Sequence, residues 1–405
     1  MSGIYIHIPF CKQACHYCDF HFSTNLKKKD EMVLALAKEI EMRSKSINHH
    51  PSYITEQIET IYFGGGTPSI LSIEDLRFLI DEVYRNYKVV EKPEITVEAN
   101  PDDLSENRII ELSKNKVNRL SIGIQSFFED DLKMMNRAHN AQEAKKCLET
   151  ATQYFDNISI DLIYGVPEMS NEKWLQNIET ALSFGAPHIS SYALTVEPKT
   201  ALHSFIQKGI IPQPDDEVAQ DHFHILVDKL SENGFIHYEL SNFGKENYFS
   251  KNNSSYWLGK KYIGIGPSAH SYDGISRSWN VSNNTLYLKS IQKNELPNET
   301  EILSDLDRYN EYIMTGLRTI WGVSLDRIEK EFGNYYLDYL HKQARKFIDD
   351  DLLYIEKNMR FSINIFQLFI LIISFASSIE KCSKKNILTE DQFFLLSHRT
   401  HHNIK

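Results

Sequence analysis

The sequence predicts an α/β protein whose core is a parallel barrel, complete or partial, of six strand–helix units. Short runs rich in β-branched and aromatic residues recur between residues 4 and 196, and a stretch with helical periodicity follows each run. Unusual polar residues gather at the ends of the same runs. Repeated alternation of strand and helix is typical of a parallel sheet, and six units favour a barrel over an open sheet.

The predicted strands are IYIHI, ETIYF, EITVEAN, RLSIGIQ, NISIDLIYG and HISSYALTV, at residues 4–8, 59–63, 94–100, 119–125, 157–165 and 188–196. Between them we expect amphipathic helices such as residues 30–43 and 72–87, the second with Ser72 as its N-cap. Beyond residue 295 the alternation stops, and a polar, proline-containing linker leads into helical periodicity. We therefore expect three parts, namely residues 1–295, a helical domain at 296–360 and an atypical apolar tail at 361–405.

Composition excludes several classes of protein. The chain of 405 residues can bury a large core, and its net charge of −11 is spread out, so it offers no basic surface for nucleic acid. Five cysteines in so long a chain do not form a disulfide framework, and the first residues lack the features of a signal peptide. We expect a protein of the reducing cytoplasm, with Cys147 and Cys382 as inert thiols.

Three further cysteines stand close together near the start of the chain, as Cys11, Cys15 and Cys18 in a C-x3-C-x2-C motif. Three thiolates from one loop suit a metal centre. One reading is a zinc site with His16 or His21 as the fourth ligand. The other is a [4Fe–4S] cluster, in which three cysteines would hold three irons and leave the fourth iron open.

The polar residues at the strand ends predict a ligand site, because side chains at the carboxyl ends of barrel strands converge on one mouth. The glycine run of Gly64-Gly65-Gly66 leaves backbone N–H and C=O groups open to a close approach. Such a site suits a ligand with an amino-acid head, a ribose and a base. The candidate residues are Thr67, Glu98, Asn100, Gln125, Asp161 and, for a carboxylate, Arg137.

These motifs together resemble the radical S-adenosylmethionine (SAM) superfamily. Roughly residues 3–350 are similar to the oxygen-independent coproporphyrinogen III dehydrogenase family and its HemW-type heme-chaperone branch. The resemblance implies a partial (β/α)6 TIM-like barrel with a small helical, winged-helix-like C-terminal domain. The stretches that carry it are YIHIPFC, YCDF, IYFGGGTPS, VEANPDDL, RLSIGIQSF, NRAH, IDLIYGVP, YELSNF, YWLGKKYIGIGPSAHSY and RYNEYIMTGLRT.

By that resemblance, Cys11, Cys15 and Cys18 would hold a [4Fe–4S] cluster whose free iron binds SAM. An electron from a reductase or other donor would then cleave SAM to a 5′-deoxyadenosyl radical and methionine, while the barrel positions the cofactors and excludes water. The implied SAM contacts are Tyr5, Tyr17, Gly65, Gly66, Thr67, Glu98, Gln125, Arg137, Asp161 and Ala193.

Two departures favour the chaperone branch over the enzyme. The dehydrogenase motif has a further cysteine where this chain has Phe20, and it follows a long segment, whereas only ten residues precede Cys11. The resemblance therefore implies a homodimeric heme chaperone that delivers heme to apo-hemoproteins, including respiratory ones. The alternative is the oxygen-independent dehydrogenase, which decarboxylates propionate side chains in heme biosynthesis.

A heme motif, H-N-x-x-Y-W in the chaperone branch, corresponds here to Asn252, Asn253, Tyr256 and Trp257. Asn252 replaces the histidine, and a carboxamide is a poor axial ligand for heme iron. Tyr256 and Trp257 could contact a porphyrin face or simply belong to the core. Three histidines in family-like motifs are other candidate ligands, or else hydrogen-bonded core residues: His7, His237 and His270.

The tail departs from the family. Residues 361–379 have the length of a membrane span and carry no charge, but polar residues interrupt them. A second family-like stretch, NILTEDQFF, follows at 386–394. An insertion or shifted reading frame would explain both features, and a membrane anchor would explain the first, so the sequence leaves membrane contact open.

Overall fold

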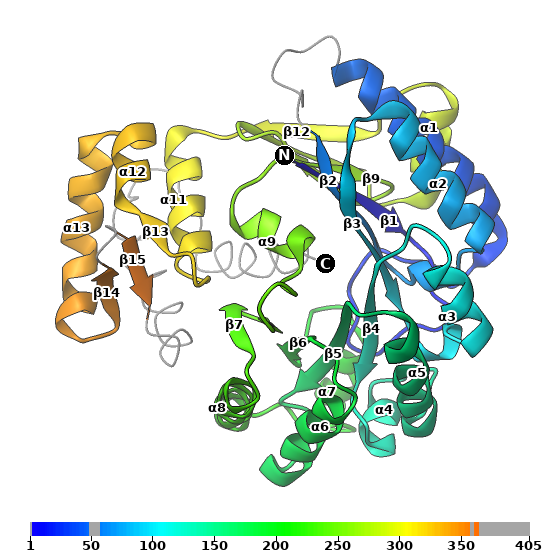
Figure 1. The fold of residues 1–405 in the computed structure, drawn as a ribbon, viewed down its shortest axis with the longest axis horizontal. Coiled ribbons are helices and arrows are strands. Elements are labelled where there is room, and N and C mark those ends of the chain that lie inside the picture. Colours follow the sequence, from blue (N-terminus) through cyan, green and yellow to red (C-terminus); the bar gives the residue numbers. More distant parts are fainter. Residues whose placement is uncertain (1, 48–56, 357–359, 364–405) are drawn as a thin grey trace.

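Six parallel strands form the centre of the computed structural model, which describes residues 2–47, 57–356 and 360–363 (Figure 1). They pair in chain order and in parallel, with register shifts at Ser2/Gly3, Ile58/Thr60 and Gly123/Gln125. All six predicted strands are present, although the third begins earlier than predicted, at Val89, and the last ends earlier, at Ala193. The strands are β1 (Ser2–Ile8), β2 (Ile58–Gly65), β3 (Val89–Ala99), β4 (Arg119–Gln125), β5 (Ile158–Tyr164) and β6 (His188–Ala193).

The sheet extends at both edges and does not close, so the barrel is partial. Beside β6 lie the antiparallel strands β8 (Asn242–Gly244) and β7 (Ile236–Glu239). On the other edge, β9 (Tyr262–Ile265) runs parallel to β1. It is followed by β10 (His270–Tyr272), β11 (Ser276–Asn280) and β12 (Asn298–Ile302).

Helices cover the outer side of the strands (Figure 1). Both predicted helices are confirmed, and Ser72 caps the second in a capping box with Asp75. The helices of this part are α1 (Lys29–Ile47), α2 (Ile73–Asn86), α3 (Glu106–Ser113), α4 (Glu129–Met134), α5 (Ala141–Tyr154), α6 (Asn171–Ser183), α7 (Ala201–Gln207), α8 (Asp216–Glu232), α9 (Lys251–Trp257) and α10 (Asn284–Gln292), with 3-10 turns η1 (Leu26–Lys28), η2 (Pro68–Ile70) and η3 (Pro101–Asp103).

Strand alternation separates an apolar outer face from a polar inner face. On β4, Leu120 and Ile122 belong to the large hydrophobic core beneath the helices. Ser121 points the other way, and its hydroxyl donates to Asp161 of β5 at 3.1 Å. Arg119 lies on the same inner face, with its Nη2 3.4 Å from His188 Nδ1. The interior of the barrel is therefore lined by polar side chains rather than by the branched apolar residues usual in TIM barrels.

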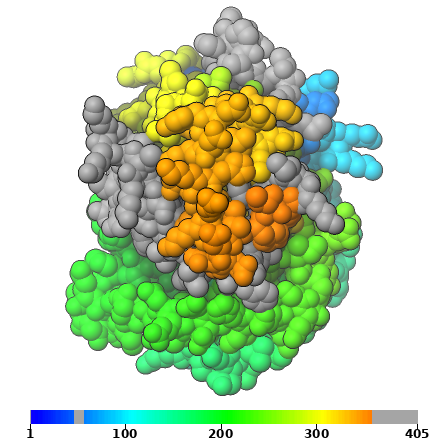
Figure 2. All heavy atoms as spheres, turned by 90° about the vertical axis from the view of Figure 1, so that its left-hand side faces the viewer, coloured from blue at the N-terminus to red at the C-terminus, as the bar shows by residue number. Residues whose placement is uncertain are grey.

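The C-terminal region has its own hydrophobic core and is mainly helical, as predicted. It contains α11 (Asp305–Gly316), α12 (Leu325–Phe332) and α13 (Asn334–Asp349). A three-stranded antiparallel sheet completes it, with β15 (Arg360–Ile363) between β13 (Val323–Ser324) and β14 (Leu353–Glu356). In Figure 2 this region faces the viewer in orange, above the green part of the barrel. The domain division at residues 295/296 stays a prediction.

Several sequence predictions fall outside the described residues. These are Cys382, the stretch 386–394 and all of the apolar run 361–379 after Ile363. Among the residues that are described, no helix is long and apolar enough to cross a membrane. Cys147, by contrast, is described and lies buried on α5, as expected.

Candidate functional site

The cysteine loop leaves the carboxyl end of β1 and is closed by backbone hydrogen bonds. The Cys11 amide donates to Ser23 O at 3.1 Å, and the Ser23 amide donates to Pro9 O at 3.0 Å. Cys11 is buried, whereas Cys15 and Cys18 are partly exposed. The loop therefore presents three thiols from a fixed backbone at the mouth of the barrel.

The end of α4 fixes the middle of this loop. Gln13 Nε2 donates to Asn136 O at 2.8 Å, and Asn136 Nδ2 donates to Ala14 O at 2.7 Å. His16 Nδ1 lies 2.8 Å from Met134 O. Asn136 has a left-handed backbone with φ of 56°, which turns the chain so that the next residue, Arg137, enters the site.

The two histidines considered as a fourth zinc ligand have other partners. The ring of His16 is held by Met134 O and packs edge-on against Phe205, while His21 Nε2 lies 2.7 Å from Asn284 Oδ1. Within the described residues, no three histidine, cysteine or carboxylate side chains gather around a single metal position. A [4Fe–4S] cluster needs no such convergence, because each thiolate binds a different iron.

The glycine run is required by close packing against β1 and the cysteine loop. A Cβ on Gly66 would lie 2.5 Å from Phe10 O, and one on Gly65, whose φ is 104°, would lie 2.5 Å from His7 Nδ1. The Gly66 and Thr67 amides donate to Ile8 O at 2.9 Å and to Phe10 O at 2.7 Å. The turn after β2 is therefore bonded directly to the start of the cysteine loop.

Arg137 connects the cysteine loop to the strand ends. Its Nη1 lies 3.3 Å from Cys15 Sγ and 3.4 Å from Tyr17 Oη. Its Nη2 donates to Asn100 Oδ1 at 2.7 Å and to Gly123 O at 2.8 Å. Burial alone would lower the pKa of Arg137, but its interactions with Tyr17 and Cys15 raise it overall. The site therefore holds a permanent cation beside one of the predicted cluster ligands.

Two of the three thiols, those of Cys11 and Cys18, are held in their neutral form. Burial raises the pKa of Cys11 to about 11, although a hydrogen bond with the Thr67 side chain lowers it in part. Burial likewise raises the pKa of Cys18 to about 12. A bound iron would reverse this preference, because coordination deprotonates a thiol. The residues thus fit a cluster whose binding releases protons.

The remaining predicted SAM contacts lie at or just below the strand ends. Glu98 accepts a hydrogen bond from Tyr62 Oη at 2.8 Å, and Tyr5 Oη lies 3.3 Å from His7 Nδ1. Gln125 has φ of 67°, and its Oε1 is buried without a hydrogen-bond partner among the described residues. An unsatisfied acceptor at this position is suited to a polar ligand. Ala193, partly exposed, ends β6.

The heme-motif residues lie at the other end of the barrel. Asn252 is 3 % exposed, accepts a hydrogen bond from Thr60 Oγ1 at 2.9 Å and donates to Tyr256 Oη at 3.4 Å. Thr60 pairs with Gly3 at the amino ends of β2 and β1, whereas the cysteine loop follows their carboxyl ends. The structure therefore separates Asn252 from the three cysteines along the strand direction.

Three side chains of α9 carry unsatisfied polar atoms. Asn253 Oδ1, Ser254 Oγ and Trp257 Nε1 are buried and make no hydrogen bond within the described residues. Among the other candidate ligands, His237 stacks on Phe243 with 4.2 Å between ring centroids, and His7 Nε2 lies 2.9 Å from His21 O. His270 lies 6.1 Å from Trp279 between ring centroids.

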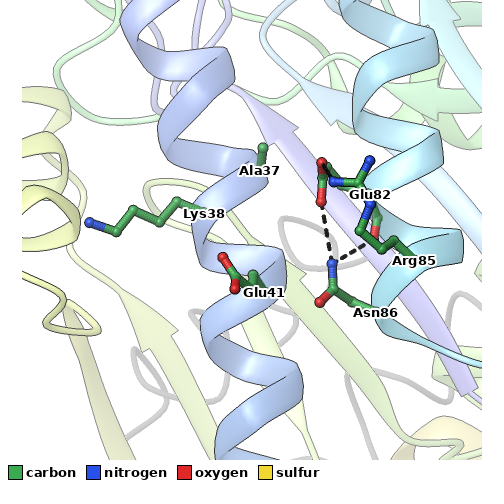
Figure 3. A pocket seen from close by; sticks show the side chains of 6 residues that line it. All are labelled: Ala37, Lys38, Glu41, Glu82, Arg85 and Asn86. Carbon is green, nitrogen blue, oxygen red and sulfur yellow. Dashed lines mark hydrogen bonds and ion pairs between the residues drawn. The ribbon is translucent and has the colours of Figure 1, made fainter.

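A surface groove between α1 and α2 contains none of the predicted site residues. Figure 3 shows Asn86 Nδ2 donating to Glu82, another of the residues that line it. It is lined by Ala37, Lys38, Glu41, Glu82, Arg85 and Asn86.

The sequence placed Asn100 among the strand-end candidates but not among the implied SAM contacts, and it gave no sign of a role for Asn136. Asn100 contacts both Arg137 and Thr67, and Asn136 is bonded to the cysteine loop. The signal that could have found them is their position in the sequence: Asn100 directly follows the predicted strand EITVEA, and Asn136 directly precedes Arg137.

Comparisons with known proteins agree on the kind of fold and on the relatives. Residues 5–181 match the model of the radical SAM superfamily, and residues 303–359 match the HemN C-terminal domain. The coproporphyrinogen III oxidase HemN from Escherichia coli, a radical SAM enzyme, superposes with a TM-score of 0.77 over 91 % of this chain and 88 % of its own, at 21 % identity. This likeness confirms the fold class.

Two relatives in sequence share the name heme chaperone HemW. The protein from Bacillus subtilis is 37 % identical over 337 residues, which cover 82 % of this chain and 87 % of the relative. The protein from Lactococcus lactis is 33 % identical over 380 residues, covering 91 % and 97 %.

Proposed function

Because the chain belongs to the radical SAM superfamily and, within it, to the family of the heme chaperone HemW, we propose that it is a heme chaperone. It binds a [4Fe–4S] cluster, SAM and heme, and it delivers heme to apo-hemoproteins. The observation that carries the cofactor part is the cysteine loop, which sets three thiols beside the Arg137 guanidinium and the strand-end residues of the barrel. The oxygen-independent dehydrogenase is not favoured, because the relatives at over 30 % identity reported above are named as chaperones.

The roles of the chain's residues follow from their chemistry. Cys11, Cys15 and Cys18 hold the cluster, whose bound form supplies an open iron for the amino and carboxylate groups of SAM. Gln125, with its unsatisfied Oε1, and the carboxylates of Glu98 and Asp161 contact the polar parts of SAM. Tyr5, Tyr17, Gly65, Gly66, Thr67, Arg137 and Ala193 complete this proposed set.

For heme, we propose that α9 forms part of the contact surface. The unsatisfied Asn253 Oδ1 and Trp257 Nε1 support this assignment, since buried polar atoms without partners are uncommon in a finished core. Asn252 is engaged by Thr60 and Tyr256, and as a carboxamide it is a poor iron ligand. Another side chain therefore supplies the axial ligand.

The proposed partners and location follow from the same reading. A reductase supplies electrons to the cluster, apo-hemoproteins, including respiratory ones, accept heme, and the protein works as a homodimer. Reduced thiols at the site suit the cytoplasm.

An anaerobic heme titration of the cluster-reconstituted protein tests the proposal. Heme binding is monitored by the Soret band, and the Asn252→His variant is titrated beside the natural chain. Saturable binding at a fixed stoichiometry in both proteins supports the chaperone and shows that histidine is dispensable at this position. Binding only in Asn252→His means that the heme site of the natural chain is lost. Binding in neither overturns the proposal, and product analysis with coproporphyrinogen III then tests the enzyme.

A further inference from the structure

Asn100 contacts two residues, Arg137 and Thr67, that lie beside different cysteines of the loop. It follows β3 directly and occupies the N-cap position of η3, yet its side chain makes no capping hydrogen bond. Instead its Oδ1 accepts from Arg137 Nη2 at 2.7 Å, and its Nδ2 donates to Thr67 Oγ1 at 3.4 Å. Arg137 in turn contacts Cys15. The Thr67 amide donates to Phe10 O at 2.7 Å, next to Cys11, and the Thr67 side chain acts on the Cys11 thiol as a hydrogen-bond partner that lowers its pKa.

The direction of these hydrogen bonds is fixed by chemistry. A guanidinium has only donors, so the amide oxygen of Asn100 must face Arg137 and its NH2 group must face Thr67. Thr67 Oγ1 then accepts from Asn100, and its own proton is left to donate to the Cys11 sulfur. A series of hydrogen bonds, all donated in the same direction, therefore runs from the Arg137 cation through Asn100 and Thr67 to Cys11. Each hydrogen bond polarises the next.

The surroundings keep Asn100 in this position. Its backbone amide donates to Ser69 Oγ at 3.3 Å, and that hydroxyl donates to Asp103 at 2.7 Å. Gly123 leaves the necessary space, because a Cβ there would lie 3.2 Å from Arg137 Nη2 and 3.5 Å from Asn100 Oδ1.

We propose that Asn100 is a positioning residue that passes the positive potential of Arg137 to the Cys11 sulfur and so raises the reduction potential of the cluster. The inference rests on the proposed function, since it requires the cluster on Cys11, Cys15 and Cys18. Hydrogen bonds to ligating sulfurs stabilise the reduced, more negative state of an iron–sulfur centre.

The test is an anaerobic redox titration of the reconstituted protein, followed by electron paramagnetic resonance (EPR) of the reduced cluster. Asn100→Ala should shift the midpoint potential to a more negative value, as should Thr67→Val, which removes the last donor of the chain. Asn100→Asp keeps an acceptor for Arg137 but cannot donate to Thr67, so it too should lower the potential. The midpoint potential of the double variant Asn100→Ala/Thr67→Val should shift no further than that of either single variant, because both substitutions interrupt the same series of hydrogen bonds.

Asn118→Ala is the matched control. This asparagine also makes two side-chain hydrogen bonds, with Ile95 N and Pro93 O at 2.8 Å each, but at the far end of β3 and β4. It should leave the potential and the EPR spectrum unchanged. Unchanged potentials in Asn100→Ala and Thr67→Val, or additive shifts in the double variant, would overturn the inference. A natural chain that takes up no cluster would instead overturn the proposed function.

Discussion

Cys15 is tied to the rest of the site through Arg137, whose Nη1 lies 3.3 Å from its sulfur. We expect Cys15→Ser to abolish the brown absorbance of the reconstituted cluster, because a hydroxyl is a far weaker ligand for iron than a thiolate. Iron and sulfide analysis measures the same loss independently of colour. Cys147→Ala is the control, since this thiol is buried on α5 away from the loop. It should keep the cluster, and an iron-loaded Cys15→Ser protein would refute the assignment.

Glu239 makes stability depend on pH. Burial raises the pKa of this carboxyl, which is 2 % exposed, from 4.5 to about 7, although Asn242 and the Ser241 amide stabilise its charge. The folded state therefore holds a proton that the unfolded chain releases between pH 4.5 and 7. Stability from this group is present below pH 4.5 and is lost as pH rises to 7, by roughly 3 kcal/mol.

Glu239→Gln removes this titration. The free energy of unfolding of the natural chain minus that of the variant should fall by roughly 3 kcal/mol between pH 4.5 and pH 8. Urea denaturation at several pH values measures it. Titrating histidines such as His237, whose pKa burial lowers to about 4, cancel in this difference because both proteins contain them. A difference that does not change with pH would show that Glu239 ionises normally.

At the scale of elements, the turn after β2 and the cysteine loop form one unit. Gly66→Ala would place a Cβ 2.5 Å from Phe10 O, a backbone atom that cannot move without shifting the loop. We expect the variant to fold but to bind substantially less iron. Gly185→Ala is the control, because that glycine has φ of 73° with open space around its Cβ position. It should cost about 1 kcal/mol of stability and leave iron binding intact. Equal iron content in both variants would contradict this account.

The elements that the sequence predicted well are those with a local signal. Six strands have a clear pattern of β-branched residues, and α2 begins at Ser72 as its capping chemistry requires. The sequence predicted that the backbone of the glycine run is open to a ligand, which stays a prediction. It did not predict that the glycines are also needed for contacts with Phe10 and His7, which lie over fifty residues earlier. Such contacts depend on strand register, and a single sequence does not encode register in any short motif.

At the scale of the whole molecule, the partial barrel and its extensions surround a polar interior. The sequence predicted which residues stand at strand ends, but not that Asn252 would lie at the opposite end of β1 and β2 from the cysteines. It also gave no sign that Arg137 would reach Cys15, 122 residues away in the chain. Both the position of Asn252 and the contact of Arg137 with Cys15 arise only when strands that are distant in the sequence pair within the sheet.

Tyr238 joins three parts of the molecule. Its hydroxyl lies 2.8 Å from His188 Nε2 on β6 and accepts from the Ser250 amide at 3.2 Å, just before α9. Its backbone oxygen accepts from Ile320 N at 3.0 Å, and its ring lies 6.1 Å from that of Trp321, between centroids. The barrel, α9 and the C-terminal region therefore meet at this one buried side chain, which is fully shielded from solvent.

Tyr238→Phe keeps the ring and removes only the hydroxyl, which leaves His188 Nε2 and the Ser250 amide without this partner. We expect a loss of roughly 2 kcal/mol in the free energy of unfolding, because two buried groups lose a hydrogen bond. Hydrogen exchange should also speed up at Ser250.

Tyr87→Phe, which loses one hydrogen bond to Ile40 O, is the control. It should cost about half as much and leave exchange at Ser250 unchanged. If Tyr238→Phe instead matched this control in both measurements, the hydroxyl would not couple α9 to the barrel. The C-terminal region would still be held by the ring contact with Trp321 and by the backbone hydrogen bond from Ile320 N, both of which the variant keeps.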